Sequence, residues 1–363
     1  MTSNIQKKRI AIIGTVGLPP NYGGFETLVD NLTKKIGKAF DITVFCQSTL
    51  KSNRKSSYNN CSLKYLPFKA NGVQSILYDM TAILLSWFKY DSMLILGSPG
   101  TVILPLLKIF KNTNTIMNFG SLEWKRDKWS ILAKKYLKFS ERVGVTNANI
   151  VVADNQYLCD YVRDTYNIKP VLLEYGGDNA KRSAITDIMV KKYSFLEKKY
   201  DLSISRAQPD NQLHLLLEAY KKIPNRNLVL ISNYSKSKYG IELKKKYSNI
   251  QNIFLVDAVY EPSEINAIRC SAKIYIHTHS LCGTAPSLVE VMSLGLPIIA
   301  YDVPANRYTT ENEALYYKSN EDLIKLLYNI NDDILDKIGV NMKEIALRRY
   351  TWDRIAKKYA QLF

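Results

Sequence analysis

The sequence predicts an α/β protein built from two successive domains, each with a doubly wound parallel sheet. Short apolar runs rich in β-branched residues, typical of buried strands, alternate with segments of helical periodicity along most of the chain. The alternation stops in a polar, lysine-rich stretch after Tyr175-Gly176-Gly177-Asp178 and then resumes. A chain of 363 residues is also long for one core and ordinary for two. We therefore predict domains at residues 1–178 and 179–345, followed by a C-terminal segment, 346–363.

The first half opens with a strand, a long loop, a helix and a second strand, which is the repeating unit of a parallel sheet. The first strand is predicted at residues 9–14, the helix at 25–36 and the second strand at 41–46. Further helices are predicted at 75–88, 101–110, 128–143 and 155–166, and further strands at 92–97, 115–118, 150–153 and 171–174.

The second half repeats this alternation. Strands are predicted at 202–205, 227–231, 252–256, 273–277 and 297–302, and helices at 213–222, 240–247, 264–270, 287–294, 321–330 and 351–362. Ligands of open parallel sheets bind beyond the carboxyl ends of the strands. Two such domains that face each other place both sets of loops at one cleft, where we expect the functional site.

Composition indicates a globular protein. Apolar residues make up 46% and charged residues 23% of the chain, and the mean hydropathy is −0.17. The five cysteines are scattered without a C-x-x-C pair, which favours reduced thiols in the cytoplasm over disulfides or zinc ligands. The polar start does not read as a secretory signal, and the longest uncharged run, 92–107, is too short and too broken to be a transmembrane segment.

The net charge of +17 at pH 7 lies mostly in residues 1–200. A basic half suggests an anionic partner, such as nucleic acid, anionic lipid or a substrate that carries a diphosphate. A general lysine-rich bias would give the same excess without any partner. Because no nucleic-acid-binding module is recognisable, we do not expect nucleic acid as a partner.

The ten-residue loop after the first strand is the first candidate site. Glycines let backbone N–H groups approach an anion, and the start of the next helix adds partial positive charge. The loop lacks the G-x-G-x-x-G pattern, and the second strand ends in Cys46-Gln47 without an acid, which argues against NAD. A plain connector is the alternative, although the loop is longer than usual. The predicted ligands are Gly14, Gly17, Tyr22, Gly23, Gly24 and Glu26.

A second candidate site is the segment from Cys282 to Glu290, which follows a strand and opens a helix. Gly283, Thr284, Pro286 and Ser287 lie where a helix start can bind phosphate, and Glu290 can accept hydrogen bonds from two ribose hydroxyls. An equally good interpretation is a capping box, in which the Glu290 side chain only completes the helix start begun by Ser287.

Three further groups stand at predicted strand ends. Arg206 can hold a diphosphate through paired donors, or it can be a solvated surface arginine. His277 and His279 lie two residues apart but lack a third ligand nearby, so no metal site is expected and His279 is expected to line the site. The loop residues Glu123, Trp124, Lys125 and Arg126 suit an acceptor sugar, although Glu123 can instead mark a helix start.

The predicted helix at 128–143 is basic and amphipathic. Such a helix can lie on an anionic membrane surface. Alternatively, its apolar face packs on the sheet and its lysines point to solvent.

Six segments together resemble family 4 of the retaining GT-B glycosyltransferases, in particular the rhamnosyltransferase branch whose N-terminal domain was formerly classed as of unknown function. The segments are GTVGLPPNYGGFETLVDNL (14–32), SLEWKRDKW (121–129), EYGGD (174–178), ISRAQPDN (204–211), HTHSLCGTAPSLVEVMSLGLPIIAYDVPANRYTTEN (277–312) and YTWDRIAKKYAQLF (350–363).

The resemblance implies a GT-B fold of two Rossmann-like domains around a central cleft, with the helix near Trp352 crossing back to the first domain. It also implies transfer with retention of anomeric configuration, without a metal or another cofactor. The loop at 14–24 would face the diphosphate and the sugar, Arg206 would hold the diphosphate, Glu290 the ribose, and residues 283–287 the sugar and phosphate. The predicted catalytic residues are Glu290, Arg206 and Glu123, and Asp178 and Asn211 join the substrate-binding set.

Members of this branch commonly use dTDP-L-rhamnose and a lipid-linked acceptor. The resemblance therefore implies a precursor of a bacterial surface polysaccharide, capsule or O-antigen, as the substrate. It also implies a cytoplasmic enzyme that can be peripheral on the inner face of the plasma membrane.

Three positions depart from the family pattern. Cys282 stands where many members have a first glutamate, and Asn211 stands where many have a lysine. Both departures fit the rhamnosyl branch. Gly120-Ser121 replaces the usual Asp-Gly, so an acid expected near the acceptor is either missing or supplied by Glu123.

Three other functions remain open from the sequence. A GT-B enzyme can use a UDP- or GDP-sugar instead. A nucleotide-sugar epimerase also has two facing α/β domains, and it would consume donor without an acceptor. A basic binding protein without enzymatic activity would show no dependence on Glu290.

Overall fold

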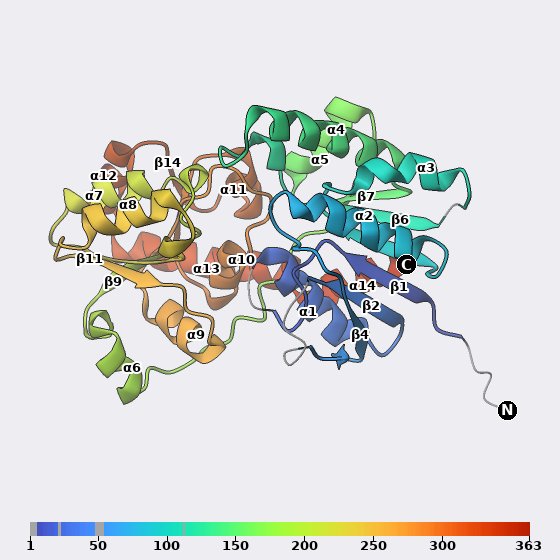
Figure 1. Cartoon of the computed structure of the whole chain (residues 1–363). Helices are drawn as coiled ribbons and strands as arrows, with labels where there is room; N and C mark the ends of the chain where they lie inside the picture. Colours follow the sequence, from blue (N-terminus) through green and yellow to red (C-terminus); the bar gives the residue numbers. More distant parts are fainter. Residues whose placement is uncertain (1–5, 21–22, 48–53, 112) are drawn as a thin grey trace. The chain divides into compact units, whose positions relative to one another are not determined.

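The computed structural model describes residues 6–20, 23–47, 54–111 and 113–363, and they form two α/β units (Figure 1). Within these ranges, unit 1 comprises the residues up to Lys125, Trp129–Tyr175 and Trp352–Phe363. Unit 2 comprises Arg126–Lys128 and Gly176–Thr351. Each unit has its own mostly parallel sheet with helices on both faces, so the predicted fold class is confirmed.

The sheet of unit 1 has the strand order β3-β4-β2-β1-β5-β6-β7-β8, and all neighbours pair in parallel except β3 and β4. Its central strands read as continuous apolar runs because helices cover both faces of the sheet. The strands are β1 (Arg9–Ile13), β2 (Asp41–Cys46), β3 (Ser57–Tyr58), β4 (Cys61–Tyr65), β5 (Ser92–Leu96), β6 (Asn114–Phe119), β7 (Ile150–Ala153) and β8 (Val171–Leu172).

The helices of unit 1 lie on two faces because crossovers between parallel strands are right-handed. The chain moves one way across the sheet from β1 to β2 and the other way from β4 through β8, so α1 covers one face and α2 to α5 cover the other (Figure 1). These helices are α1 (Gly24–Ile36), α2 (Gln74–Trp87), α3 (Leu104–Lys108), α4 (Ile131–Asn147) and α5 (Gln156–Tyr166).

The C-terminal helix α14 (Trp352–Leu362) belongs to unit 1, where it packs beside α1. Tyr359 on this helix accepts a hydrogen bond from the buried side chain of Asn118, and Lys35 pairs with Asp353 at 2.7 Å. The predicted return of the final helix to the first domain is therefore confirmed.

The sheet of unit 2 has the strand order β11-β10-β9-β12-β13-β14, and all neighbours pair in parallel. The chain runs outward from β9 through β10 to β11, then returns to β12 and runs outward the other way. This reversal lies between β9 and β12. The strands are β9 (Tyr200–Ile204), β10 (Asn227–Ser232), β11 (Ile253–Asp257), β12 (Tyr275–His277), β13 (Ile298–Tyr301) and β14 (Leu315–Tyr317).

The helices of unit 2 also divide between two faces. α7 packs beside α12 on one face, and α10 packs between α9 and α13 on the other. The helices are α6 (Asp187–Lys192), α7 (Leu213–Lys221), α8 (Lys238–Tyr247), α9 (Pro262–Ser271), α10 (Pro286–Leu294), α11 (Pro304–Thr309), α12 (Asn320–Asn329) and α13 (Asp332–Arg349).

The structure corrects several sequence predictions. The long helix α13 was not predicted; it begins where the side chain of Asn331 accepts a hydrogen bond from the Ile334 amide at 2.9 Å. The hairpin of β3 and β4 was also missed, although Asn59 and Asn60 take the left-handed conformation that a two-residue turn needs. The elements α6, α11 and β14 were not predicted either.

Two predicted helices have different bounds. α4 begins at Ile131 because the side chain of Ser130 caps it by accepting from the Ala133 amide at 3.3 Å. The helix predicted at 101–110 is a 3₁₀ turn, Thr101–Ile103, followed by the short α3. Among the described residues, no helix is both long enough and apolar enough to cross a membrane.

Candidate functional site

The strand order of unit 2 reverses between β9 and β12, so the crevice beyond their carboxyl ends is the expected ligand site of this sheet. The loop after β9 runs from Ser205 to Gln212, and the loop after β12 runs from Thr278 to Ala285. The Ser280 hydroxyl and amide both donate to the Asp210 carbonyl, at 2.7 and 3.1 Å. These bonds fix the two loops against each other.

Arg206 lies at the centre of this reversal point. Its side chain is half-buried, and within the described part of the chain its guanidinium has no hydrogen-bond or ion-pair partner. Its backbone is fixed, because its carbonyl accepts from the Asn211 side chain at 2.8 Å. The Arg206 guanidinium is therefore a positioned cation that no anion among the described residues neutralises.

The side chain of Asn211 holds the backbone at Arg206. Its side chain is completely buried, and its amide nitrogen donates to the Arg206 backbone. In this role Asn211 shapes the loop instead of carrying a charge.

Four buried polar atoms on the two loops have no hydrogen-bond partner among the described residues. They are the Gln208 side-chain oxygen, the Asn211 side-chain oxygen, the Thr278 hydroxyl and the His279 Nδ1. Buried polar groups in native proteins are almost always satisfied by protein, water or ligand. Their concentration at one reversal point is consistent with a polar ligand site.

His277, at the end of β12, and His279, in the loop after it, are uncharged at neutral pH. Burial lowers the pKa of His277 to about 3. Desolvation, followed by the electrostatic effect of a protonated His277 and of the cations Arg206 and Arg126, lowers the pKa of His279 well below its ordinary value. The imidazole rings lie 4.5 Å apart. The described residues contain no group of three or more histidine, cysteine or acidic side chains placed to hold a metal ion.

Asn306, in α11, shapes the loop that carries His279. Its completely buried side chain donates to the His279 carbonyl at 3.0 Å and to the Tyr301 carbonyl at 2.8 Å. The loop after β12 is thus fixed on both sides, by Asn306 and by Asp210.

The helix α10 begins immediately after this loop, with Ala285 as its N-cap and Pro286 at its first position. Neither Ser287 nor Glu290 caps the helix, because no side chain closes its start. The capping-box interpretation of Ser287 and Glu290 is therefore wrong. Gly283 and Thr284 are buried just before the helix, so its N-terminal amides face the loop at the reversal point.

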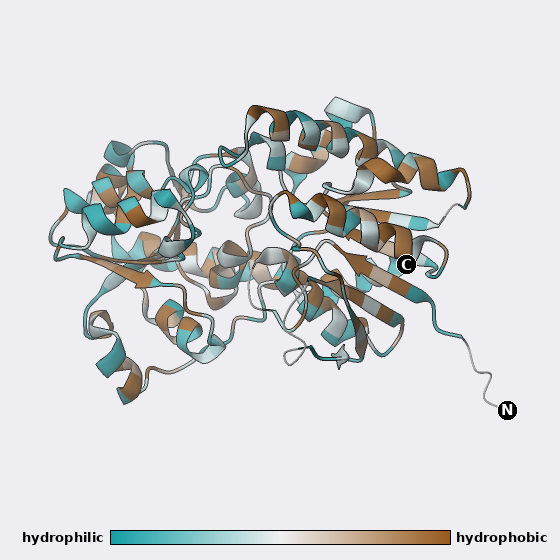
Figure 2. Ribbon diagram, viewed as in Figure 1, coloured by the Kyte–Doolittle hydropathy of each residue, from teal (hydrophilic) through white to brown (hydrophobic). Residues whose placement is uncertain are grey.

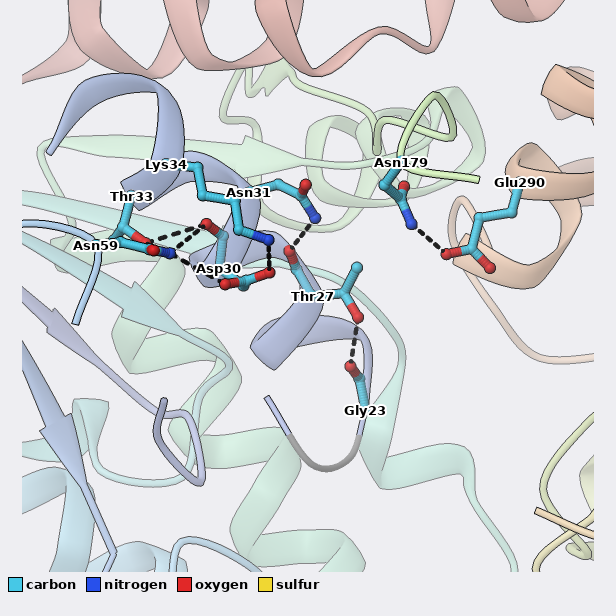
Figure 3. Close-up of polar contacts among 9 residues, drawn as sticks. All are labelled: Gly23, Thr27, Asp30, Asn31, Thr33, Lys34, Asn59, Asn179 and Glu290. Atoms are coloured by element: carbon cyan, nitrogen blue, oxygen red, sulfur yellow. Dashed lines mark hydrogen bonds and ion pairs between the residues drawn. The ribbon is translucent and has the colours of Figure 1, made fainter. Parts of the chain in front are cut away.

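Glu290 instead belongs to a buried polar cluster on the second turn of α10. Its Oε2 pairs with the guanidinium of Arg269 on α9, and both side chains are about nine-tenths buried. Its Oε1 accepts a hydrogen bond from Asn179 at 2.8 Å (Figure 3). Arg269 and Asn179 together fix the carboxylate in one orientation.

The segment before Asn179 lies directly on α10. A side chain at Gly177 would place its Cβ 2.2 Å from the Val289 carbonyl, so only glycine permits this approach. The close contact explains how Asn179 reaches Glu290. Asp178, predicted as a substrate ligand, lies between these two residues and is partly exposed.

Arg126 is grouped with unit 2. Its guanidinium forms an ion pair with Asp210 on the loop after β9, and both side chains are at least nine-tenths buried. The structure therefore brings Arg126 to the reversal point of unit 2 and leaves Glu123, Trp124 and Lys125 in unit 1.

In unit 1 the glycine-rich loop follows β1, where the strand order also reverses, between β1 and β5. Gly14 has φ +95°, and a Cβ there would lie 2.2 Å from the Leu96 carbonyl. Gly17 has φ +132°, and a Cβ there would lie 2.8 Å from the Cys46 Sγ. Both glycines are therefore required by the backbone. Tyr22 lies outside the described residues.

Glu26 stabilises the same loop from the first turn of α1. Its buried Oε1 accepts from the Thr15 hydroxyl at 3.0 Å and from the Val16 amide at 2.7 Å. Gly23 caps α1 and Gly24 begins it. Thr27, one turn along, donates through its hydroxyl to the Gly23 carbonyl at 3.1 Å (Figure 3).

The remaining predicted residues of unit 1 form a group on the loop before α4. Glu123 accepts a hydrogen bond from the Trp129 indole at 3.0 Å. Trp124 lies under two ammonium groups, with Lys125 5.4 Å and Lys138 4.6 Å from a ring centroid. Trp124, Lys125 and Lys138 border a groove of about 980 Å³ along α4.

Comparison with known proteins agrees with this geometry. Residues 185–336 match the family model for glycosyl transferases group 1, and residues 7–178 match a model for a domain of unknown function. Residues 185–336 therefore correspond to a group 1 glycosyltransferase domain. No curated protein matches the chain in sequence.

Solved structures show that the chain has the GT-B fold. A sucrose-phosphate synthase from Thermosynechococcus elongatus aligns with a TM-score of 0.81 at 17% identity, covering 98% of both chains. HepE from Anabaena in complex with UDP-glucose aligns with a TM-score of 0.75 at 13% identity, again over 98% of both chains. The catalytic domain of Arabidopsis thaliana starch synthase IV, bound to ADP and acarbose, aligns with a TM-score of 0.69 at 11% identity and 98% coverage of each.

Several residues of the candidate site were missed from the sequence. Arg269 and Asn179, which hold Glu290, carry no local motif. Asn306 lies in a helix that was not predicted. Asp154 is buried directly after β7, and a Cβ at Gly120 would lie 3.5 Å from its carboxylate. An acid therefore stands beside Gly120 although the usual Asp-Gly pair is replaced; its place after a strand was the one available signal.

We expect Glu26→Ala to destabilise unit 1. The change removes the acceptor of the Thr15 hydroxyl and the Val16 amide, and a hydrogen bond to a charged group contributes about 2 kcal/mol. The urea midpoint of unfolding checks this expectation. Glu344→Ala, at an exposed glutamate, is the matched control and should leave the midpoint unchanged. Equal midpoints for both variants would contradict the proposed role of Glu26.

Proposed function

We propose that this glycosyltransferase transfers a sugar from a nucleoside-diphosphate donor that binds at the reversal point of unit 2. The observation that carries the proposal is the Arg206 guanidinium, which has no partner in the described part of the chain and lies among buried polar atoms that also lack partners. A guanidinium suits a diphosphate because its paired donors match two phosphate oxygens.

The same arrangement supports departure of the diphosphate. As the bond between the sugar's anomeric carbon and the diphosphate breaks, negative charge grows on the leaving oxygens. Arg206 and the N-terminal amides of α10 would stabilise this charge from fixed positions. The new bond forms between the anomeric carbon and the oxygen of an acceptor hydroxyl, and the hydroxyl proton passes to the departing diphosphate oxygen. The resemblance favours attack on the face that the diphosphate leaves, with retention of configuration and without a metal or other cofactor.

Glu290 is proposed to bind the ribose of the donor. Oε2 stays paired with Arg269, while Oε1, which accepts from Asn179, is the oxygen we assign to the ribose hydroxyls.

We propose dTDP-L-rhamnose as the donor, because the motifs quoted above resemble the rhamnosyltransferase branch. A UDP-sugar is the second candidate, because HepE, a GT-B structure similar to this chain, is in complex with UDP-glucose. The proposed acceptor is a lipid-linked oligosaccharide precursor of a bacterial surface polysaccharide, such as a capsule or O-antigen. The proposed location is the cytoplasmic face of the plasma membrane, with peripheral attachment.

The proposal is tested by incubating the protein with each nucleotide sugar, with and without a lipid-linked oligosaccharide mixture, in the presence of a metal chelator. We expect release of nucleoside diphosphate only when the acceptor is present, and a product whose anomeric NMR signal matches the configuration of the donor. Conversion of the donor sugar without acceptor would instead indicate an epimerase. No release from any donor would contradict the proposed function.

A further inference from the structure

The helices on one face of the unit 1 sheet expose large apolar side chains to solvent. More than half of the large exposed hydrophobic residues among those described fall between residues 73 and 139, on or beside α2, α3 and α4. They are Val73, Leu77, Leu84, Leu85 and Phe88 on α2 and its ends; Leu106, Ile109 and Phe110 on and after α3; and Ile131, Leu132 and Phe139 on α4.

The opposite face of the same sheet differs. Among the described residues of α1 and α14, no large hydrophobic side chain is exposed. Figure 2 shows the hydrophobic colouring of α2 and α3 beside the mixed colouring of α4. The helices that carry these side chains are neighbours, because α3 packs beside α4 and α2 packs beside the 3₁₀ turn that precedes α3. Large apolar surface that stays exposed is typical of an interaction site.

Positive charge borders this apolar surface along α4. The groove of about 980 Å³ follows α4 and is lined by five cationic side chains: Lys125, Lys134, Lys135, Lys138 and Arg142. Ile131 and Phe139 line the same groove. Apolar and cationic side chains of α4 therefore line the same groove.

The acidic side chains of the same helices are buried. The three helices carry two acids, Asp79 on α2 and Glu141 on α4, and both are at most 2% exposed. Glu141 is enclosed by three donors, since it accepts from the hydroxyls of Tyr161 and Tyr166 at 2.6 Å each and from Lys138 at 3.1 Å. The partner of this face must consequently be apolar in part and anionic in part.

We propose that the face formed by α2, α3 and α4 docks on an anionic lipid bilayer. The exposed apolar side chains enter the boundary between headgroups and acyl chains, and the cations of the groove contact phosphate headgroups. A second copy of this chain fits the face less well, because a symmetric contact would bring cations against cations. The inference rests on the proposed function, since a lipid-linked acceptor lies in such a bilayer.

Vesicle flotation of the full chain tests this surface. One vesicle is phosphatidylcholine alone, and the other is an equal mixture of phosphatidylglycerol and phosphatidylcholine. We expect the protein to float with the mixed vesicles and to be released as ionic strength rises. Lys134→Glu/Lys135→Glu should weaken binding by at least about thirtyfold, because two attractive charges near the surface become repulsive.

The apolar contribution is tested by Ile131→Ser/Leu132→Ser, at side chains that are 76% and 79% exposed. This variant should lose binding by at least about tenfold. The matched controls lie on unit 2: Lys245→Glu/Lys337→Glu for charge, and Ile188→Ser, at a side chain that is 78% exposed, for apolar area. Both controls should float like the wild type.

Nucleotide binding by calorimetry is measured on every variant and should not change, so a folding defect or a failure of the proposed donor site is recognised separately. Failure of the wild type to float with anionic vesicles would overturn the proposal. Equal flotation of the α4 variants and their controls would overturn it too. So would a dimer in solution that Ile131→Ser/Leu132→Ser converts to monomer, because a second copy would then be the partner of this face.

Discussion

Arg206→Ala is expected to lower sugar transfer at least about tenfold while the protein stays folded. The guanidinium is half-buried and has no partner in the described part of the chain, so its removal leaves no buried anion behind. What is lost is the stabilisation of charge on the departing diphosphate, and a positioned donor of this kind contributes about 3 kcal/mol to a transition state. Turnover at saturating donor, with the urea midpoint as a folding check, measures this effect.

Two further variants sharpen this test. Arg206→Lys keeps the charge but loses the paired donors, and it should recover only part of the activity. Arg182→Ala, at an exposed arginine of unit 2, is the matched control and should retain wild-type turnover. Turnover of Arg206→Ala equal to that of the control would contradict the assignment of the diphosphate site.

Arg269→Ala is expected to destabilise unit 2 by about 3 kcal/mol, because it leaves the Glu290 carboxylate buried without its cationic partner. The remaining hydrogen bond from Asn179 neutralises no charge. The free energy of unfolding from urea titration is the measurement.

A double-mutant cycle separates the ion pair from the packing. Glu290→Gln keeps the shape of the side chain and removes the charge, so Arg269→Ala made in this background should cost less by about 2 kcal/mol. Identical costs in both backgrounds would mean that the two side chains are not energetically coupled. That result would contradict the cluster around Glu290.

Much of the fold could be predicted because it depends on local patterns. The apolar runs at β1, β2 and β5 and the helical spacing of α1 and α2 are readable along the chain, and the structure has these elements within one or two residues of the predicted bounds. The helix α13 was missed although its start carries a local signal, the capping residue Asn331 followed by two acids in the first turn. It is stabilised by packing against α10, which is distant along the chain.

The sequence could place candidate residues whose position depends only on the neighbouring strand or helix. Arg206 comes two residues after β9, and Gly283 and Thr284 stand before a helix. Roles that depend on a distant partner were not predictable. Ser287 and Glu290 have the spacing of a capping box, yet Glu290 pairs with Arg269 and Asn179, which lie 21 and 111 residues away. Spacing alone cannot distinguish a capping carboxylate from a buried ion pair.

Glu26 illustrates the same limit in unit 1. Its place in the first turn of a helix after a glycine-rich loop is equally typical of a ligand and of a residue that stabilises the loop. The hydrogen bonds to Thr15 and Val16 show that it stabilises the loop. The prediction that the loop itself faces a substrate stays a prediction.

The measurement that tests the central claim most directly is calorimetric titration of the full chain with dTDP, UDP, GDP and NAD, in parallel with the Arg206→Ala variant. The account predicts that one nucleoside diphosphate binds the wild type, dTDP before UDP, and that the variant binds it at least about tenfold more weakly. NAD should not bind. Binding of none of the four, or equal binding of the nucleotide by wild type and variant, would contradict a diphosphate site at the reversal point of unit 2.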